Sequence, residues 1–406
     1  MRILHVIRSL DPRGGGPIEF MNSISAEWAK SGHDCDLVTL DASTDPLVSR
    51  SPLTTFALGT EATSGYVSGR GYGYSPRLVP WMREHAAFYD IVIVHGLWNY
   101  ASVGSWRGLR NTGVPYFVFT HGMLDPWFNR AFPIKAAVKT VLWKGLENRV
   151  LRDACGVLFT TTEERDLAGR SFQPYSARPF VVGLGTRDIQ GKATAQRLAF
   201  TQRMPDLDGR RFILFLSRIH PKKGIDLLIR AFAQQAKMQP DLDLVVAGPD
   251  QVGLQSTLQS LAEDLGVASR VHWPGMLTGD AKLGAFVASE FFALTSHQEN
   301  FGVAIAEALA LAKPVLITDK VNIWRDIEED GAGIVVTDDI DGVSKGLAQL
   351  CVMSLEKRAS ISNNARRCFE NRYDLRRIAT SMIELMYDKS RSWNANAKRV
   401  TASGPA

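Results

Sequence analysis

The sequence lacks the long apolar runs and cysteine pairs that would point to a membrane or an oxidising compartment. No segment of the 406 residues holds about 18 or more uninterrupted apolar residues, so no transmembrane helix is expected. The apolar run at 2–7 is too short, and too soon followed by Arg8 and Asp11, for a signal peptide. The four cysteines form no CxxC pair, which is typical of buried free thiols in a reducing compartment. A cytoplasmic protein is therefore predicted.

Strong charge of either sign is also missing. The formal net charge is +5 and the pI about 9.0. This mildly basic balance is compatible with an anionic substrate or membrane surface, but it is too weak to indicate nucleic acid. No nucleic-acid partner is predicted.

Short apolar runs alternate with helical patterns along the chain. Continuous apolar runs are typical of parallel strands buried on both faces, so the alternation predicts two α/β, doubly wound, Rossmann-like domains. We predict domains at 1–190 and 211–390, a linker at 191–210 and a disordered tail at 391–406. The predicted strands are 2–7, 35–40, 54–58, 91–95, 116–121, 156–161 and 179–183, then 211–217, 242–248, 270–273, 291–296, 314–318 and 333–337.

The segment 41–80 is rich in Ser, Thr, Gly and Pro. It is either a long surface loop or a loop that binds an acceptor, because long loops beside a cleft often carry function.

The most specific motif is TSHQENFGVAIAE at 295–307. A strand ends at Ser296 and a helix is predicted to begin near Gly302, whose neighbouring N–H groups suit a diphosphate. Glu299 lies in the loop, and Glu307 lies about two helical turns further on, where it can accept from ribose hydroxyls. Alternatively, these carboxylates are a helix cap and a solvated side chain.

A second motif, SRIHPKKGID at 217–226, follows a buried strand. Arg218 and Lys223 lie at its carboxyl end, where they can neutralise a pyrophosphate leaving group without a metal. The alternative is a solvated basic loop.

Two further motifs follow strands in the first half of the chain. GGGP at 14–17 permits close backbone approach to a ligand or simply makes a tight turn; it is not a GxGxxG fingerprint. His121, in HGMLDP, ends the fifth predicted strand and can contact a sugar hydroxyl or be structural. His95 is a weaker candidate of the same kind.

Together these motifs resemble the family-4 (GT4) retaining glycosyltransferases of group 1, which have the GT-B fold: two Rossmann-like domains facing each other across a cleft. The resemblance covers about residues 1–390 and is most specific at Glu299 and Glu307. It implies a nucleotide diphosphate sugar as co-substrate, no cofactor, and retention by front-face attack. It places His121 and Glu299 at the reacting centre. It implies donor binding by Gly15, Gly16, Arg218, Lys223, Met276, Leu277, Asn300, Phe301, Gly302, Val303 and Glu307.

No metal site is assigned. Asp206-Leu207-Asp208 and Asp241-Leu242-Asp243 have the DxD spacing that metal-dependent transferases use. One falls in the predicted linker and the other begins a predicted strand.

A basic amphipathic pattern at 127–152 raises the question of a membrane partner. The segment contains six cationic residues and one acidic residue, which gives a local charge of 6 − 1 = +5. The pattern fits a helix on an anionic bilayer, which would favour a lipid-linked acceptor, or a helix with an apolar face in the core. Its apolar stripe comprises Ile134, Val138, Val141, Leu142, Leu146 and Val150.

Three functions are carried forward. The leading one is transfer of a hexose from GDP-mannose or a UDP-hexose to a sugar or lipid-linked glycan, in polysaccharide or glycolipid synthesis. The alternatives are a nucleotide-sugar epimerase and a non-catalytic protein that binds glycans or nucleotide sugars.

Overall fold

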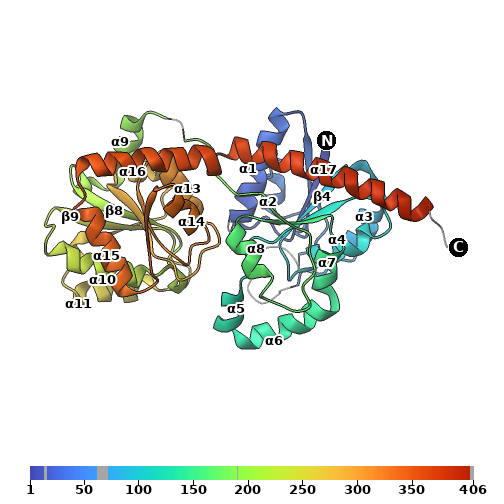
Figure 1. Ribbon diagram of the computed structural model, residues 1–406, viewed down its shortest axis with the longest axis horizontal. Helices are drawn as coiled ribbons and strands as arrows, with labels where there is room; N and C mark the ends of the chain where they lie inside the picture. The colour runs from blue at the N-terminus through green and yellow to red at the C-terminus, as the bar shows by residue number, and fades with distance from the viewer. Residues whose placement is uncertain (13–15, 62–71, 190, 403–406) are drawn as a thin grey trace. The chain divides into compact units, whose positions relative to one another are not determined.

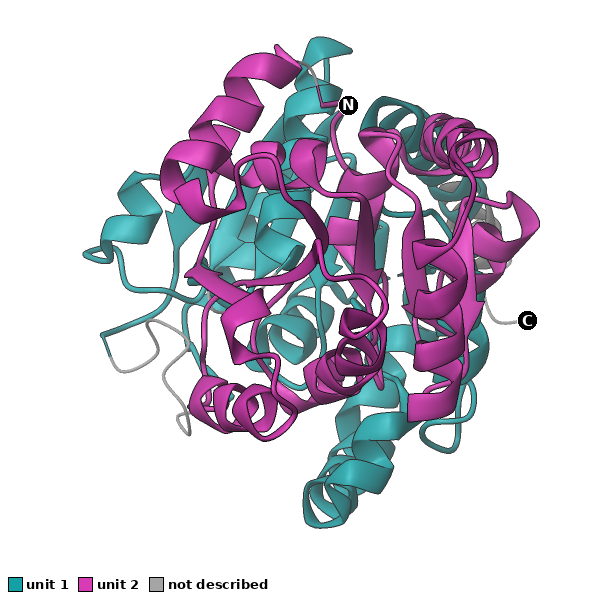
Figure 2. Cartoon of the chain, turned by 90° about the vertical axis from the view of Figure 1, so that its left-hand side faces the viewer, with its two compact units in different colours: residues 1–184, 375–406 teal, residues 185–374 magenta. Residues whose placement is uncertain are grey.

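The computed structural model describes residues 1–12, 16–61, 72–189 and 191–402 (Figure 1). The chain divides into two compact units, coloured separately in Figure 2. Unit 1 comprises residues 1–184 and 375–406, and unit 2 comprises residues 185–374. Gly15 lies outside the described residues.

Unit 1 contains one parallel sheet of seven strands in the order β3-β2-β1-β4-β5-β6-β7. Its strands are β1 (Arg2–Ile7), β2 (Asp34–Thr39), β3 (Thr54–Ala57), β4 (Ile91–His95), β5 (Tyr116–Phe119), β6 (Gly156–Phe159) and β7 (Pro179–Val181). Its helices are α1 (Gly16–Lys30), α2 (Pro46–Ser49), α3 (Leu78–His85), α4 (Tyr100–Leu109), α5 (Pro126–Ala131), α6 (Pro133–Leu142), α7 (Asn148–Arg152), α8 (Thr162–Ala168) and α17 (Leu375–Ala402).

Unit 2 contains a second parallel sheet, of six strands, in the order β10-β9-β8-β11-β12-β13. Its strands are β8 (Arg211–Leu216), β9 (Leu242–Ala247), β10 (Val271–Gly275), β11 (Phe291–Leu294), β12 (Val315–Thr318) and β13 (Gly333–Val336). Its helices are α9 (Ala193–Arg203), α10 (Ile225–Ala236), α11 (Gln255–Asp264), α12 (Gly279–Ala288), α13 (Val303–Ala310), α14 (Trp324–Glu329), α15 (Ile340–Cys351) and α16 (Leu355–Cys368).

All thirteen predicted strands occur, and two of them, β1 and β4, have the predicted bounds. In both sheets the order reverses beside the first strand of the unit, as in doubly wound folds that bind ligands beyond the carboxyl ends of their strands. The central strands are buried on both faces because their side chains are almost all apolar. The two doubly wound α/β units are thus as predicted.

The predicted domain bounds differ from the structure at three points. Residues 191–210 are not a plain linker, because α9 occupies most of them and belongs to unit 2. The last helix begins within the predicted domain 211–390, although its pattern allowed packing on either domain, and it belongs to unit 1. There α17 packs beside α1, and Trp28 Nε1 donates to the carbonyl oxygen of Ala379 at 2.8 Å (Figure 1). The predicted disordered tail is helical as far as Ala402.

Across the described ranges, no helix has the length and apolar character that would let it cross a bilayer. The cysteines at 35, 155, 351 and 368 are free thiols, three of them buried.

Candidate functional site

The carboxyl edge of the unit 2 sheet is held together by backbone hydrogen bonds between successive loops. Ser217 N donates to Ala247 O at 3.0 Å, and Gly248 N donates to Gly275 O at 2.9 Å. Gly224 has a φ of 59°, and a Cβ there would overlap with the carbonyl of Thr295. Only glycine permits this approach, which brings the loop after β8 against the loop after β11.

Lys223 and Glu299 form a buried ion pair at this junction. The Lys223 ammonium contacts a Glu299 carboxylate oxygen, and the side chains are 5% and 16% exposed. Burial acts to raise the pKa of Glu299, but the charges of Lys223 and Lys222 outweigh it and hold the pKa below its usual range. The Glu299 carboxylate is therefore charged near pH 7, and two motifs 76 residues apart meet in one site.

Further cations surround this pair. Lys222 Nζ donates to Gln298 Oε1 at 3.1 Å, and Arg218 Nη1 lies 3.4 Å from Gln251 Oε1. These cations also affect His220, whose pKa is lowered first by burial and then by the charges of Lys222 and Arg218. Burial is the larger cause, but the cations that add to it are close enough together to favour an anion.

The start of α13 adds backbone donors beside the same pair. Gly302 is its N-cap residue with a φ of 78°, and a Cβ there would lie 3.4 Å from Glu299 Cγ. Phe301 is buried with its ring edge-on to Tyr373, 5.4 Å between centroids. This anchor fixes the helix start at Val303, and the first N–H groups of such a helix favour an anion.

Asn300 bridges the loop to the next strand connection. Its backbone N–H donates to Glu299 Oε1 at 3.1 Å, and its side-chain oxygen accepts from Asn322 Nδ2 at 3.3 Å.

Glu307 is buried on α13 and bonded to Lys282 of α12, with 2.6 Å between Nζ and Oε1. The alternative reading of Glu307 as a solvated side chain is therefore wrong. Lys282 was not identified from sequence. Its partner lies 25 residues away, and no local pattern marks it.

The segment after β10 divides into an exposed and a buried residue. The Met276 side chain is 65% exposed, whereas Leu277 is 7% exposed and belongs to the core. Met276 follows Gly275, which is bonded to Gly248 beside the Arg218 loop. Only Met276 offers its side chain to a flat ring such as a nucleobase, so a role for Leu277 would have to use its backbone.

A second pair unrecognised from sequence links His297 to Asp338, with 2.6 Å between Nδ1 and Oδ1. The hydrogen bond to Asp338 raises the pKa of His297.

In unit 1, the corresponding edge carries a chain of three histidines. His5 Nδ1 lies 2.9 Å from His95 Nε2, and His95 Nδ1 lies 2.9 Å from His121 Nε2. Burial lowers the pKa of each imidazole, to about 3 for His5, so the chain is neutral near pH 7.

The hydrogen bond of Ser25 sets the direction of this chain. The single Ser25 hydroxyl proton is used by Met21 O at 2.7 Å, so the oxygen accepts from Nε2–H of His5 at 3.1 Å. A neutral imidazole with one donor nitrogen accepts at the other. Each histidine therefore carries its proton on Nε2, and His121 presents an unprotonated Nδ1. His95, the weaker sequence candidate, holds His121 in this tautomer.

His121 does not end a strand as predicted, because β5 ends at Phe119 and His121 lies in the following turn with a φ of 50°. Glu164 holds the residues on both sides of it: Thr120 Oγ1 donates at 2.7 Å and Gly122 N at 2.6 Å. The ring also stacks on Phe119, 4.3 Å between centroids. These contacts fix a left-handed conformation that a non-glycine residue rarely adopts.

The glycine motif is described only in part. Gly16 is exposed at the start of α1, and a Cβ there would have no neighbour within 4 Å among the described residues. Its role, like that of Gly15, stays a prediction.

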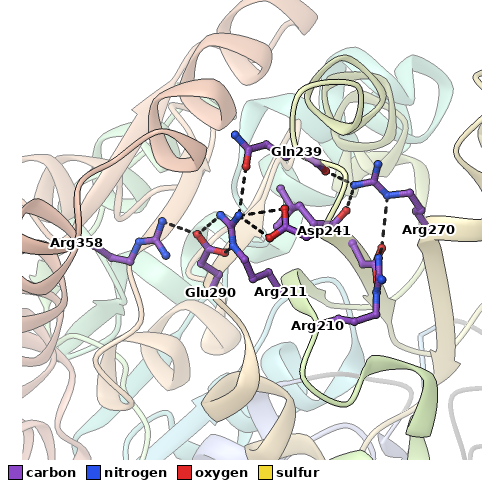
Figure 3. Close-up of polar contacts among 9 residues, drawn as sticks. Arg210, Arg211, Gln239, Asp241, Arg270, Glu290 and Arg358 are labelled. Carbon is purple, nitrogen blue, oxygen red and sulfur yellow. Dashed lines mark hydrogen bonds and ion pairs between the residues drawn. The ribbon is translucent and has the colours of Figure 1, made fainter.

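The second DxD sequence is engaged by arginines at the amino edge of unit 2. Figure 3 shows Arg211 between Asp241 and Glu290, with its Nη1 3.1 Å from Asp241 Oδ2 and its Nε 2.7 Å from Glu290 Oε2. Asp243 is paired with Arg210. These carboxylates are paired with arginines at the amino-terminal ends of the strands, which is the edge opposite to the one that carries the motifs.

Two family models match the chain over most of its length. The model described as "Glycosyl transferases group 1" matches residues 200–368, and that described as "Glycosyl transferase 4-like domain" matches residues 15–185.

Characterised relatives share low identity with the chain. A GDP-mannose:cellobiosyl-diphosphopolyprenol alpha-mannosyltransferase from Xanthomonas oryzae pv. oryzae is 23% identical over 393 residues, covering 96% of this chain and 97% of the relative. A D-inositol 3-phosphate glycosyltransferase from Rhodococcus jostii is 28% identical over 260 residues, covering 63% and 56%.

Solved structures show the same fold. Anabaena HepE in complex with UDP and glucose has a TM-score of 0.72 and 20% identity, covering 96% of this chain and 100% of that one. Sucrose-phosphate synthase from Thermosynechococcus elongatus has a TM-score of 0.70 and 17% identity, covering 95% and 98%. The predicted two-domain GT-B fold is confirmed.

Proposed function

The chain belongs to the group 1 glycosyltransferases of family 4. From this premise we propose that it transfers a hexose from GDP-mannose or a UDP-hexose to a sugar or lipid-linked glycan. The reaction retains the anomeric configuration, uses no metal and serves polysaccharide or glycolipid synthesis. The name of the Xanthomonas relative gives GDP-mannose as a substrate, and the HepE structure contains UDP and glucose, which supports both donor options.

The observation that carries the proposal is the charged carboxyl edge of unit 2. Arg218 and Lys223 supply cations, and the start of α13 supplies N–H groups, within one set of loops. A departing diphosphate develops negative charge, and fixed cations and dipoles stabilise it without a metal. Glu307, held by Lys282, accepts from the ribose hydroxyls, and Glu299 accepts from hydroxyls of the sugar.

The reaction proceeds on one face of the sugar. The acceptor hydroxyl oxygen forms a bond to the anomeric carbon as the bond from that carbon to the diphosphate oxygen breaks. The departing diphosphate takes the hydroxyl proton, so the protein supplies no nucleophile. His121 offers Nδ1 as an acceptor to a sugar hydroxyl and, being neutral, adds no charge at the reacting centre.

Calorimetric titration with UDP, GDP and ADP in the absence of metal tests the donor site. We expect one nucleotide to bind selectively, and Glu307→Ala to weaken it about tenfold because a buried hydrogen-bond acceptor is lost. Glu356→Ala, an exposed glutamate of unit 2, is the matched control and should bind as the wild type does. A folded wild-type protein that binds none of the three nucleotides would refute the assignment.

A peripheral membrane site is part of the same proposal, and α6 supports it. Ile134, Val138 and Val141 are 83%, 59% and 72% exposed, and they fall on one stripe of the helix. Cations flank this stripe, whereas the later members of the predicted stripe, Leu146 and Val150, face the protein. An exposed apolar stripe between cations fits an anionic bilayer, where a lipid-linked acceptor would be presented.

Vesicle sedimentation tests this surface. The wild type should bind phosphatidylglycerol vesicles at low salt and bind phosphatidylcholine vesicles weakly. Ile134→Ser/Val141→Ser should reduce binding at least tenfold, whereas Leu355→Ser, which alters an equally exposed leucine of unit 2, should not. Equal binding by all three proteins would remove α6 from the proposal.

A further inference from the structure

Close packing of α3 against α4 gathers basic residues on one side of unit 1. A Cβ on Gly104 would lie 2.5 Å from a side-chain carbon of Leu78, and one on Gly108 would lie 2.5 Å from Met82 Cβ. The two glycines therefore let the helices approach more closely than larger residues would. Arg107 precedes Gly108 and Arg83 follows Met82, so this contact brings the two arginines to the same place.

A cavity of about 480 Å³ opens here and lies within unit 1. Among the described residues, three arginines and two tyrosines line it and no carboxylate does. Its size is that of a small-molecule site. These five residues are Tyr74, Arg83, Tyr100, Arg107 and Arg110.

Two of the arginines lie beside aromatic side chains. Arg107 lies beside the Tyr100 hydroxyl, and the Arg110 guanidinium lies 5.5 Å from the centre of the Trp106 ring. Among the described residues, none of the three lining arginines makes an ion pair within 4.0 Å. Arg110 also interacts electrostatically with Asp153, beyond ion-pair distance. The cavity nevertheless brings three guanidinium groups together, and such groups bind phosphate in a bidentate manner.

The tyrosines give the cavity an apolar wall beside these cations. Tyr74 is 60% exposed, and its ring meets that of Tyr100 edge-on, 4.7 Å between centroids. Tyr100 begins α4, five residues after His95 ends β4, so this wall starts near the carboxyl edge of the sheet. Tyr100 itself is buried, so the exposed face of the wall is the Tyr74 ring. An exposed aromatic face with a hydroxyl tip suits the C–H face and hydroxyls of a sugar.

We propose that this cavity binds a phosphorylated saccharide, with Arg83, Arg107 and Arg110 on the phosphate and Tyr74 and Tyr100 on the sugar. The inference rests on the proposed function, in which the cavity recognises the phosphate-bearing end of the acceptor. The shared chemistry is a sugar phosphate, whether free or at the diphosphate end of a lipid-linked glycan.

Calorimetric titration with glucose 1-phosphate, glucose and inorganic phosphate tests the site on the full chain. Glucose 1-phosphate should bind at least tenfold more tightly than either of the others. Arg83→Gln/Arg107→Gln should weaken it at least tenfold, and Tyr74→Ala severalfold. Arg50→Gln, an exposed arginine elsewhere in unit 1, should not change the affinity. A diphosphate-linked disaccharide on a short lipid, titrated in parallel, separates the two sources because the tighter ligand identifies the natural one.

Two results would overturn the proposal. One is an affinity for glucose 1-phosphate that is unchanged in Arg83→Gln/Arg107→Gln. The other is equal affinity for inorganic phosphate and glucose 1-phosphate, which would indicate a simple anion site. Lys223→Gln distinguishes this cavity from the donor site, because it should lower nucleotide affinity without affecting the cavity. If the nucleotide assignment fails but the arginine variants still lose glucose 1-phosphate, the cavity remains and only its link to acceptor binding is lost.

Discussion

Glu147 in unit 1 and Glu299 in unit 2 are both withdrawn from solvent, yet their pKa values shift in opposite directions. Burial raises the pKa of Glu147 to about 7, although the backbone N–H of Trp98 donates to it at 3.0 Å and Ser102 Oγ lies 3.1 Å from it. Burial acts on Glu299 in the same direction, but the Lys223 ammonium beside it stabilises the charged carboxylate and the pKa is lowered instead. Hydrogen bonds alone do not keep a buried carboxylate charged to the extent that a counter-ion does.

The contrast extends to the carboxyl edges of the two sheets. In unit 2 the edge holds charged pairs with Lys222 and Arg218 close by, and this concentration of positive charge suits a diphosphate. In unit 1 it holds three neutral imidazoles, which suit hydroxyl groups. The same architecture thus presents one charged and one neutral surface, because the first pairs its buried ions and the second keeps its titratable groups uncharged.

Breaking the Lys223–Glu299 pair should have the largest effect. Lys223→Met leaves a carboxylate without its counter-ion, which costs roughly 3–5 kcal/mol of folding free energy. Urea unfolding measures this loss, and nucleotide titration measures the parallel loss of affinity. Lys223→Met/Glu299→Gln should recover most of the stability without recovering nucleotide binding. A double variant as unstable as Lys223→Met would mean that the unpaired Glu299 carboxylate is not the source of the loss.

Glu147 gives unit 1 an unusual dependence of stability on pH. The unfolded chain releases this proton near pH 4.5, whereas the folded protein holds it to about pH 7. Stability should therefore fall by about 3 kcal/mol as the pH rises between these values, and then level off. Thermal unfolding across this range measures it.

Glu147→Gln should remove this fall and be the more stable protein at pH 8. The exposed Glu84→Gln should behave as the wild type does. A fall of the same size in Glu147→Gln would assign the pH dependence to another group.

The histidine chain should show the smallest effect, visible mainly by spectroscopy. His95→Phe removes the acceptor for His121 Nε2–H, so His121 should populate both neutral tautomers. Two-bond ¹⁵N–¹H spectra distinguish the tautomers, and kcat should fall about tenfold with little change in the KM for the donor. His95→Gln can both donate and accept and should restore the wild-type spectrum. A single Nε2–H tautomer in His95→Phe would contradict the direction inferred for the chain.

The strands were predictable because a buried parallel strand consists of a short, continuous run of apolar residues. The runs VLIT in β12 and IVIVH in β4 by themselves indicate strands that are buried on both faces of a sheet. The motif loops were predictable for a similar reason: Gly224 and Gly302 are required by backbone conformation, and the charged residues beside them stand out within a few positions.

The features that could not be predicted from the sequence depend on contacts between residues that are far apart in the chain. Lys282 and Asp338 lie 25 and 41 residues from the partners they bind, and their own surroundings are ordinary. The basic amphipathic pattern at 127–152 is interrupted by a π-helical turn at Trp143–Glu147, which places Glu147 inside the protein although Lys144 and Arg149 near it are exposed. The polar end of α17 gave no apolar signal of its own, so the sequence indicated disorder there.

The return of α17 to unit 1 affects how the molecule is made. Unit 2 is one uninterrupted stretch of chain, whereas unit 1 is assembled from two stretches on either side of it. On the ribosome, unit 2 can fold as soon as residue 374 has emerged, but Trp28 must wait for Ala379 before it gains its hydrogen-bond acceptor. The half of the enzyme that is translated first is therefore the half that is completed last.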